Sequence, residues 1–289
     1  MTVYYNDRFM LKEEVCISPD DRAFLFADGA YEVIRAYGGR FFQSHAHLQR
    51  LERSLQALRI VQPETAKLSD IAEELVRCND LGHGDAIVYI QVTRGTAPRR
   101  HAFPDKGISP TVYLCASSLR SSPEKPERGV GIILVPDIRW MRCDIKSLAL
   151  LPNVLANQEA RERGAEEAVF VRDGVITEGT HTNFCAVFDG RLVTHPRTNL
   201  ILGGITRQVV LDLCRRFNVA CLESPIHDRD LKKASELMIV STTVEVLPVV
   251  QVNDWLVGDG KPGPLTRKLQ QAFRAEVAAQ CRPVEDVET

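Results

Sequence analysis

The sequence lacks the features of several protein classes. No run of about 18 apolar residues, the minimum for a membrane-spanning helix, occurs among its 289 residues. The 36 basic and 38 acidic residues nearly balance, giving a net charge of −2, so there is no positive excess to bind nucleic acid or an anionic membrane. The first residues do not have the basic-then-apolar order of a signal peptide. We therefore expect a soluble, cytoplasmic protein.

The cysteine and histidine patterns argue against two further classes. The eight cysteines include no C-x-x-C pair, and we expect buried thiols rather than disulfides. The seven histidines form neither H-x-x-x-H nor H-E-x-x-H. His45 and His47 are two positions apart, a spacing that places them on different faces of a helix. The sequence therefore predicts no metal site.

What is present is the composition of a globular protein, with 44% hydrophobic and 26% charged residues. The length favours two domains. Between Ser117 and Pro126 there is little to bury and there are two prolines, so we interpret this stretch as an interdomain linker. We place a small N-terminal domain over residues 1–120 and a larger domain over residues 121–289.

Strands and helices are mixed in both halves. Leucines at steps of three and four predict a helix from His45 to Leu58, and similar steps predict one over residues 67–78. Asp173-Gly174 and Asp189-Gly190 predict hairpin turns. Hairpins mixed with helices, rather than strict βαβ repeats, favour an α+β fold. Further strands are expected over residues 3–5, 8–10, 31–37, 40–43, 86–93, 111–116, 131–136, 168–171, 237–241 and 248–252, and further helices over residues 153–163, 206–217 and 264–278.

Lysine is scarce, with nine residues among the 36 basic ones. Eight of them lie among polar neighbours, in turns or at helix ends, whereas Lys146 lies in the largely apolar stretch Cys143–Leu151. Burial there would disfavour the charged form, lower the pKa of the amine and make it a nucleophile. The alternative is a surface lysine beside a strand.

A second candidate site is the start of the helix that follows Gly203-Gly204. Glycines let a backbone approach closely, and the free N–H groups of a helix start bind anions. The hydroxyls of Thr206 and of Ser241-Thr242-Thr243 would add donors. The same residues are also consistent with a simple connection between elements.

Two other segments carry charge on turns and loops. Glu178 lies on a turn between two strands, and Arg99-Arg100-His101 lies on a loop suited to a small carboxylate. Each is also consistent with a solvated surface. Taken together, the candidates suit a ligand with an aldehyde for the lysine, a phosphate for the helix start and a basic nitrogen for the glutamate. Pyridoxal 5′-phosphate has all three groups.

Several longer segments resemble one family, the class IV (fold-type IV) pyridoxal-phosphate aminotransferases. The resemblance extends over about residues 3–275 and is greatest to the bacterial branch that acts on D-amino acids. It implies a two-domain fold, with a small N-terminal α/β domain and a larger cofactor-binding domain that contains a barrel-like sheet. The segments are Glu178-x-Thr180-x-x-Asn183-Phe184, Leu192-x-Thr194, Leu202-x-Gly204-Ile205-x-Arg207, Asp28–Glu32, Val92–Gly95 and Arg139–Leu148.

The resemblance also implies roles for individual residues. Lys146 would bind the cofactor covalently and then move the proton, and Glu178 would pair with the pyridine nitrogen. Tyr31, Arg99 and His101 would trap the substrate carboxylate, the loop of Arg99 and His101 coming from the partner subunit of a homodimer. The remaining cofactor-binding residues are Arg50, Ile205, Thr206, Ser241 and Thr242 at the phosphate, and Leu202, His181 and Thr182 near the ring.

The implied reaction transfers an amino group between a D-amino acid, such as D-alanine, and a 2-oxo acid, such as 2-oxoglutarate. It would follow ping-pong kinetics through pyridoxamine phosphate. The alternatives on the same fold are a branched-chain L-amino acid or R-amine aminotransferase and an aminodeoxychorismate lyase. A non-catalytic cofactor-binding protein is a further alternative, which the presence of both Lys146 and Glu178 disfavours.

Overall fold

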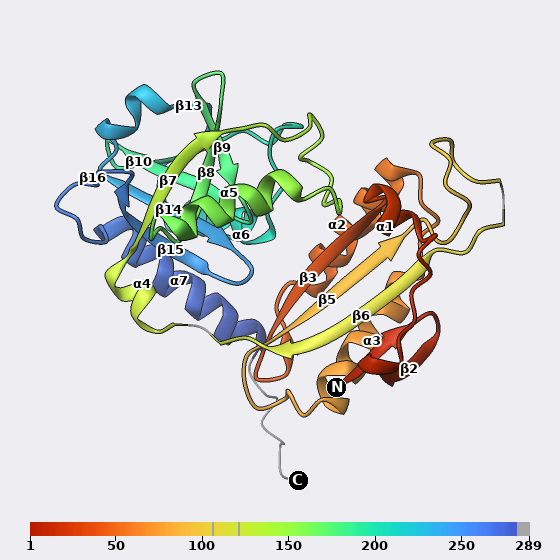
Figure 1. The fold of residues 1–289 in the computed structure, drawn as a ribbon. Coiled ribbons are helices and arrows are strands. Elements are labelled where there is room, and N and C mark those ends of the chain that lie inside the picture. Colours follow the sequence, from red (N-terminus) through yellow and green to blue (C-terminus); the bar gives the residue numbers. More distant parts are fainter. Residues whose placement is uncertain (106, 121, 282–289) are drawn as a thin grey trace, which may run out of the picture. The chain divides into compact units, whose positions relative to one another are not determined.

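The computed structural model describes residues 1–105, 107–120 and 122–281, and these residues belong to two compact units (Figure 1). Of the described residues, unit 1 contains 1–105, 107–120, 145–149 and 277–281. Of the described residues, unit 2 contains 122–144 and 150–276. The segment around Lys146 therefore belongs to the same unit as the first strands, although it lies far from them in the sequence.

Unit 1 is built on a six-stranded sheet whose described strands all pair antiparallel. Their order is β2-β1-β6-β5-β3-β4, so a hairpin lies at each edge. Asn6 and Asp7 join β1 to β2 with φ angles of 40° and 66°, the conformation that a tight two-residue hairpin turn requires. The strands are β1 (Thr2–Tyr5), β2 (Arg8–Leu11), β3 (Gly29–Tyr37), β4 (Arg40–Phe41), β5 (Ala86–Thr93) and β6 (Thr111–Ser118).

Two amphipathic helices, α2 (Ser44–Leu58) and α3 (Thr65–Cys78), pack against this sheet (Figure 1). Leu51 and Leu55 of α2 and Leu75 of α3 are buried in one cluster with strand residues. This confirms the two helices predicted from the leucine spacing. A short helix, α1 (Arg22–Phe26), and a 3-10 helix over Lys12–Glu14 were not predicted from the sequence.

Unit 2 contains a ten-stranded sheet that closes on itself. The order is β12-β11-β10-β14-β15-β7-β8-β9-β13, and β9 also pairs with β10, so the strands from β10 to β9 form a closed, barrel-like ring. The closing pair is Glu178 of β9 and Asn183 of β10. The strands are β7 (Val130–Pro136), β8 (Glu167–Arg172), β9 (Val175–Gly179), β10 (Asn183–Phe188), β11 (Arg191–Thr194), β12 (Cys221–Glu223), β13 (Ile226–His227), β14 (Glu236–Ser241), β15 (Glu245–Val252) and β16 (Trp255–Leu256), which pairs with β15.

Two helices of unit 2 are crossovers between parallel strands, which a short hairpin cannot join. Helix α5 (Leu151–Glu162) connects β7 to β8, and α6 (Ile205–Arg216) connects β11 to β12. Since the other described pairings of this sheet are antiparallel except that of β7 with β15, the α+β prediction is confirmed. The remaining helical elements are α4 (Glu124–Arg128), a 3-10 helix over Asp228–Lys233 and α7 (Pro264–Cys281).

The stretch from Ser117 to Pro126 contains more regular structure than a linker. Ser117 and Ser118 pair with β5 and extend β6, and α4 follows. Strands pair through their backbone groups, so the polar end of β6 could form a strand although its side chains gave no hydrophobic pattern in the sequence. In α4, an ion pair of 3.1 Å joins Glu124 to Arg128, at the i,i+4 spacing that supports exposed helices.

The cysteines are free thiols, and four of the eight (Cys143, Cys185, Cys214 and Cys281) are buried. This agrees with the expectation of thiols rather than disulfides. Across residues 1–105, 107–120 and 122–281, no helix has both the length and the apolar content that a membrane span requires.

Candidate active site

Lys146 lies in a segment of unit 1 that runs beside the start of β3. The backbone N–H of Tyr31 donates to the Lys146 carbonyl at 3.0 Å, and the N–H of Leu148 donates to the Gly29 carbonyl at 3.0 Å. A Cβ atom at Gly29 would lie 2.8 Å from the Val92 carbonyl oxygen and 2.7 Å from the Leu148 side chain, and because the backbone oxygen cannot move aside, this position requires glycine. The backbone of Lys146 is thereby held against β3.

The amino group of Lys146 lies over an aromatic ring. Its Nζ atom is 4.3 Å from the centre of the Tyr31 ring, within the distance of about 6 Å at which a cation is attracted to a ring. The Tyr31 ring stacks on Tyr89, with 5.7 Å between centroids and 29° between planes. All three side chains are half-buried. The structure therefore brings together Lys146 and Tyr31, two of the three residues predicted to be catalytic.

Arg50, the predicted phosphate ligand, is buried against a carboxylate that sequence reasoning missed. Glu32 of β3 accepts from Nε and Nη2 of Arg50 at 2.9 and 2.7 Å, and its Oε1 lies 3.1 Å from Nδ1 of His47. Burial alone would raise the pKa of Glu32, but the charges of Arg50 and His47 hold it well below its usual range. The Glu32 carboxylate therefore fixes the Arg50 guanidinium. The sequence did contain an indication of this role, because Glu32 is a charged residue among the apolar residues of a strand.

The predicted substrate-binding residues Arg99 and His101 lie on the exposed loop after β5, and both contact one ring. The Arg99 guanidinium lies 5.1 Å from the centre of the Phe26 ring, and the His101 ring lies 5.5 Å from it. Phe26 is the last residue of α1 and is half-buried. The structure thus places the two side chains together.

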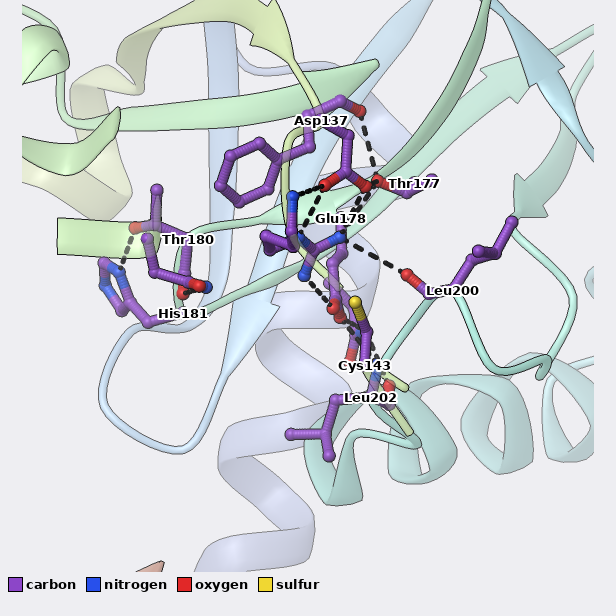
Figure 2. A network of polar contacts seen from close by, with 12 residues as sticks. Asp137, Cys143, Thr177, Glu178, Thr180, His181, Leu200 and Leu202 are labelled. Carbon is purple, nitrogen blue, oxygen red and sulfur yellow. Dashed lines mark hydrogen bonds and ion pairs between the residues drawn. The ribbon is translucent and has the colours of Figure 1, made fainter. Parts of the chain in front are cut away.

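In unit 2, Glu178 is buried at the point where the barrel closes (Figure 2). Its Oε1 accepts from Nη1 of Arg139 at 2.6 Å, and its Oε2 accepts from the Leu202 N–H at 2.9 Å and from Nδ2 of Asn183 at 3.1 Å. Burial raises the pKa of Glu178 to about 7, although Arg139 lowers it. The predicted residues Glu178 and Leu202 therefore lie in direct contact.

Arg139 is the central cation of this network, and sequence reasoning gave it no role. It donates to Asp137 through Nε and Nη2, both at 2.9 Å, and to Thr177 at 3.2 Å (Figure 2). Its guanidinium also lies 4.3 Å from the centre of the Phe170 ring. Because Arg139 is buried and held from several sides, it fixes one oxygen of Glu178 in place. The sequence did contain an indication of this network, because the opposite charges of Asp137 and Arg139 directly follow the buried strand β7.

The predicted anion site at the start of α6 depends on Gly204. The helix begins at Ile205, one residue before the predicted start, and Gly204 is its N-cap. A Cβ atom at Gly204 would lie 1.9 Å from Oδ1 of Asn183, whose amide also donates to the Leu202 carbonyl at 2.9 Å. Asn183 therefore joins Glu178 to the turn that precedes the helix. Ile205 and Thr206 are buried in the first helical turn.

The hydroxyls of Ser241-Thr242-Thr243 lie at the end of β14, as predicted, with Ser241 as its last residue. Ser241 Oγ lies 3.3 Å from Thr243 Oγ1, and all three residues are half-buried. These hydroxyls belong to unit 2, as do Ile205 and Thr206, whereas Arg50 belongs to unit 1.

His181 and Thr182 lie in the turn between β9 and β10, around a second carboxylate that sequence reasoning missed. Fully buried Glu167 accepts from Thr180 Oγ1 at 2.5 Å and from Thr182 Oγ1 at 3.0 Å, and it lies 3.1 Å from Nδ1 of the exposed His181. Glu167 therefore determines the conformation of this turn. A charged residue at the start of a buried strand indicates a partner, but the sequence does not identify which residue it is.

Comparison with known proteins identifies the family of this chain. Residues 29–252 match the family described as Amino-transferase class IV. The chain is 40% identical to a D-alanine aminotransferase of Staphylococcus haemolyticus, over 96% of this chain and 98% of that protein. It is also 40% identical to a D-alanine aminotransferase of Bacillus licheniformis, over 97% and 98% of the two chains. The chain belongs to the class IV aminotransferase family.

Solved structures of branched-chain aminotransferases have the same fold. The branched-chain amino acid aminotransferase of Escherichia coli gives a TM-score of 0.89 at 25% identity, covering 99% of this chain and 97% of that one. The branched-chain aminotransferase of Thermoproteus uzoniensis gives 0.86 at 27% identity, covering 97% and 95%. The family and fold predicted from the sequence are confirmed. The substrates are therefore an amino acid and a 2-oxo acid, and pyridoxal 5′-phosphate is the cofactor that membership implies.

The raised pKa of Glu178 predicts how stability of this aminotransferase depends on pH. The native pKa of about 7 exceeds the value of about 4.3 in an unfolded chain, so the native state binds the proton more tightly. The contribution is present below about pH 4.3 and is lost as the pH rises through about 7. Glu178→Gln removes this pH-dependent contribution. As the pH rises from 5 to 8, the free energy of unfolding of the variant minus that of wild type should therefore increase by on the order of 3 kcal/mol.

The measurement is the melting temperature of both proteins, freed of bound cofactor, at each pH. Glu159→Gln changes an exposed carboxylate in α5 and serves as the control. A difference between Glu178→Gln and wild type that stays constant from pH 5 to pH 8 would contradict the raised pKa.

Proposed function

We propose that this class IV aminotransferase transfers an amino group between a D-amino acid, such as D-alanine, and a 2-oxo acid, such as 2-oxoglutarate, with pyridoxal 5′-phosphate as cofactor. The observation that carries the proposal is the 40% identity to D-alanine aminotransferases over nearly the whole length of both chains. Likeness to branched-chain aminotransferases is lower in sequence, at 25% and 27% identity. This favours the D-amino acid reaction over the branched-chain L-amino acid alternative.

The residues present fit the cofactor. Glu178 has three hydrogen bonds, two to Oε2 and one to Oε1, whereas a carboxylate accepts about four. The remaining acceptor position on Oε1 suits a protonated ring nitrogen, which would also keep the buried carboxyl ionised. Lys146 supplies an amine that lies over the Tyr31 ring, and the first turn of α6 supplies N–H donors suited to a phosphate.

We assign the cofactor contacts as follows. Lys146 would hold the cofactor covalently, Glu178 its ring nitrogen, and Leu202 its ring face. The phosphate would be bound by Arg50, Ile205, Thr206, Ser241 and Thr242. His181 and Thr182 would lie near the ring. When bound, the cofactor supplies an electrophilic carbon for amines and a conjugated ring that accepts the electrons left by the α-proton.

The protein residues then have distinct tasks. The Lys146 amine would take the α-proton of the substrate and later return a proton. Tyr31 holds that amine beside its ring and limits where it can move. Glu178, held by Arg139, keeps a proton on the ring nitrogen by remaining an anion next to it. No other described lysine shares the surroundings of Lys146, a half-buried position against a tyrosine ring.

Arg99 and His101 would bind the substrate carboxylate and thereby choose the enantiomer. With the carboxylate fixed and the α-hydrogen directed at Lys146, only one enantiomer can place its side chain in open space, and the relatives named above favour the D form. A guanidinium binds a carboxylate through two parallel hydrogen bonds, which an ammonium cannot do.

Arg99→Lys tests this assignment. It should raise the KM for D-alanine and for 2-oxoglutarate and lower kcat/KM by about ten- to a hundred-fold, because charge-assisted contacts of this kind are worth roughly 1.5–3 kcal/mol. Steady-state kinetics with each substrate give the result, and Arg100→Lys in the same loop is the control. An Arg99→Lys variant with wild-type KM for both substrates would show that another residue binds the carboxylate.

We also infer that the enzyme is a homodimer with shared active sites. An apolar strip on α5 supports this inference, since Leu151, Val154 and Leu155 at helical spacing are 68%, 58% and 57% exposed. Exposed apolar surface of this kind marks protein contacts. The eight free cysteines fit the reducing cytoplasm, where we place the protein.

Subunit complementation tests the shared site. A chain with Arg99→Ala and a chain with Lys146→Ala should each form a nearly inactive homodimer. After subunit exchange, each heterodimer should contain one site with both native residues, so equal mixing should restore about a quarter of wild-type activity. If subunits demonstrably exchange and no activity returns, Arg99 acts within its own chain.

A further inference from the structure

The loop that carries Arg99 and His101 is held by α1 in three ways, and the first is the Phe26 ring. Three side chains contact this ring: Arg22 at 4.8 Å, Arg99 at 5.1 Å and His101 at 5.5 Å. Arg99 and His101 are themselves exposed. An exposed arginine has many rotamers, and attraction to a ring face restricts them before any ligand binds.

The second contact fixes the backbone between the two side chains. Nη1 of Arg22 donates to the Arg100 carbonyl at 2.7 Å and lies 3.5 Å from the Ala102 carbonyl. Nε of the same buried guanidinium donates to Asp28 at 2.8 Å. Arg22 therefore connects the loop to a carboxylate at the start of β3.

The third contact anchors α1 itself. Asp21 caps the helix by accepting from the Ala23 N–H at 2.8 Å, and its other oxygen accepts from Thr93 at 3.0 Å and Thr111 at 2.6 Å. Since Thr93 ends β5 and Thr111 begins β6, the helix is bound to both strands that flank the loop. Contacts with α1 therefore connect the loop to the sheet.

We propose that Phe26 is a positioning residue for substrate recognition, and that its ring sets the affinity for the substrate carboxylate by holding the guanidinium of Arg99 and the imidazole of His101 together. Arg22 supports it by fixing the backbone at Arg100. The inference rests on the proposed function, in which Arg99 and His101 bind that carboxylate. Phe26 itself touches neither substrate nor cofactor in this account.

The chain offers a matched control in Phe103, which lies in the same loop. Its ring contacts two other guanidinium groups, those of Arg94 at 3.7 Å and Arg59 at 5.3 Å. Phe103→Leu therefore removes the same kind of contact from the same loop. Phe26→Tyr is the conservative variant, because it keeps the ring.

Phe26→Leu should raise the KM for D-alanine and for 2-oxoglutarate about tenfold, with kcat changed by less than about twofold. Phe103→Leu and Phe26→Tyr should keep the wild-type KM. If Phe26→Leu melts too early to assay, Phe26→Met fills similar space without a ring and takes its place. A purely structural role for Phe26 would lower the melting temperature without this split between KM and kcat.

Two further measurements locate the effect. In an Arg99→Ala background, Phe26→Leu should raise the dissociation constant of 2-oxoglutarate, measured by calorimetry, by less than about threefold, because most of its effect acts through Arg99. The dissociation constant of 2-oxoglutarate for the holoenzyme, measured by calorimetry, should weaken by the same factor of about ten in Phe26→Leu. Unchanged values in Phe26→Leu, or an equal rise in Phe103→Leu, would overturn the proposal.

The proposed function and the positioning role of Phe26 can be contradicted separately. If the wild-type holoenzyme does not transaminate D-alanine, the proposed function is wrong, and the calorimetric comparison of Phe26→Leu with Phe103→Leu still decides the role of Phe26. If wild type is active and Phe26→Leu binds 2-oxoglutarate as tightly as wild type, the positioning role alone is wrong.

Discussion

Lys146→Ala should lower the rate of D-alanine transamination by at least about 10⁴-fold, because the substitution removes both the covalent anchor of the cofactor and the base that takes the α-proton. The fold should persist, since the hydrogen bonds that hold this segment to β3 come from the backbone. Activity is measured with D-alanine and 2-oxoglutarate, and the melting temperature reports the fold.

Chemical labelling identifies the same residue independently. Borohydride reduction of the wild-type holoenzyme should fix the cofactor to the peptide that contains Lys146. Lys12→Ala, which changes an exposed lysine of unit 1, should keep both the label and the activity. Recovery of the label on a different lysine would contradict the assignment.

Glu178→Gln should lower kcat by about 10²–10³-fold, because the ring nitrogen would lose the anion that keeps it protonated when charge develops in the ring. Gln matches Glu in size, and its carbonyl oxygen can still accept from Asn183 and the Leu202 N–H, although its amide nitrogen cannot accept from Arg139. Arg139 keeps its contacts to Asp137, so bound cofactor and fold should be retained. Absorbance spectra report the bound cofactor, and single-turnover kinetics with D-alanine report the proton-transfer step.

Arg139→Lys provides a graded comparison for that result. Lysine keeps a positive charge near Glu178 but cannot reproduce the contacts to Asp137, Thr177 and Glu178 together. Its effect on kcat should lie between those of wild type and Glu178→Gln. A Glu178→Gln enzyme with wild-type turnover would show that this carboxylate does not face the ring nitrogen.

Much of the fold could be predicted from local patterns. Leu51 and Leu55 marked α2 by their spacing, and Asp173-Gly174 and Asp189-Gly190 marked turns whose φ angles are all positive. The closure of the barrel could not be predicted in this way, because the pairing of Glu178 with Asn183 depends on the positions of all the strands between them. The resemblance, not the periodicity, carried the prediction of a barrel-like sheet.

The candidate site divides along similar lines. Lys146 was distinctive because it is a lone lysine in an apolar stretch, and Gly204 because glycine permits close approach. Glu32, Arg139 and Glu167 were missed because each acts on a residue distant in sequence, through contacts that only the fold creates. Their common signal, a charged residue within or beside a buried strand, indicates a partner without identifying it.

The most direct test of the account compares two substrates with one enzyme preparation. Wild-type holoenzyme is mixed with 2-oxoglutarate and either D-alanine or L-leucine at equal concentrations, and initial rates of glutamate formation are measured. The account predicts faster amino transfer from D-alanine. Faster transfer from L-leucine under identical conditions would contradict the D-amino acid assignment and favour a branched-chain L-amino acid aminotransferase.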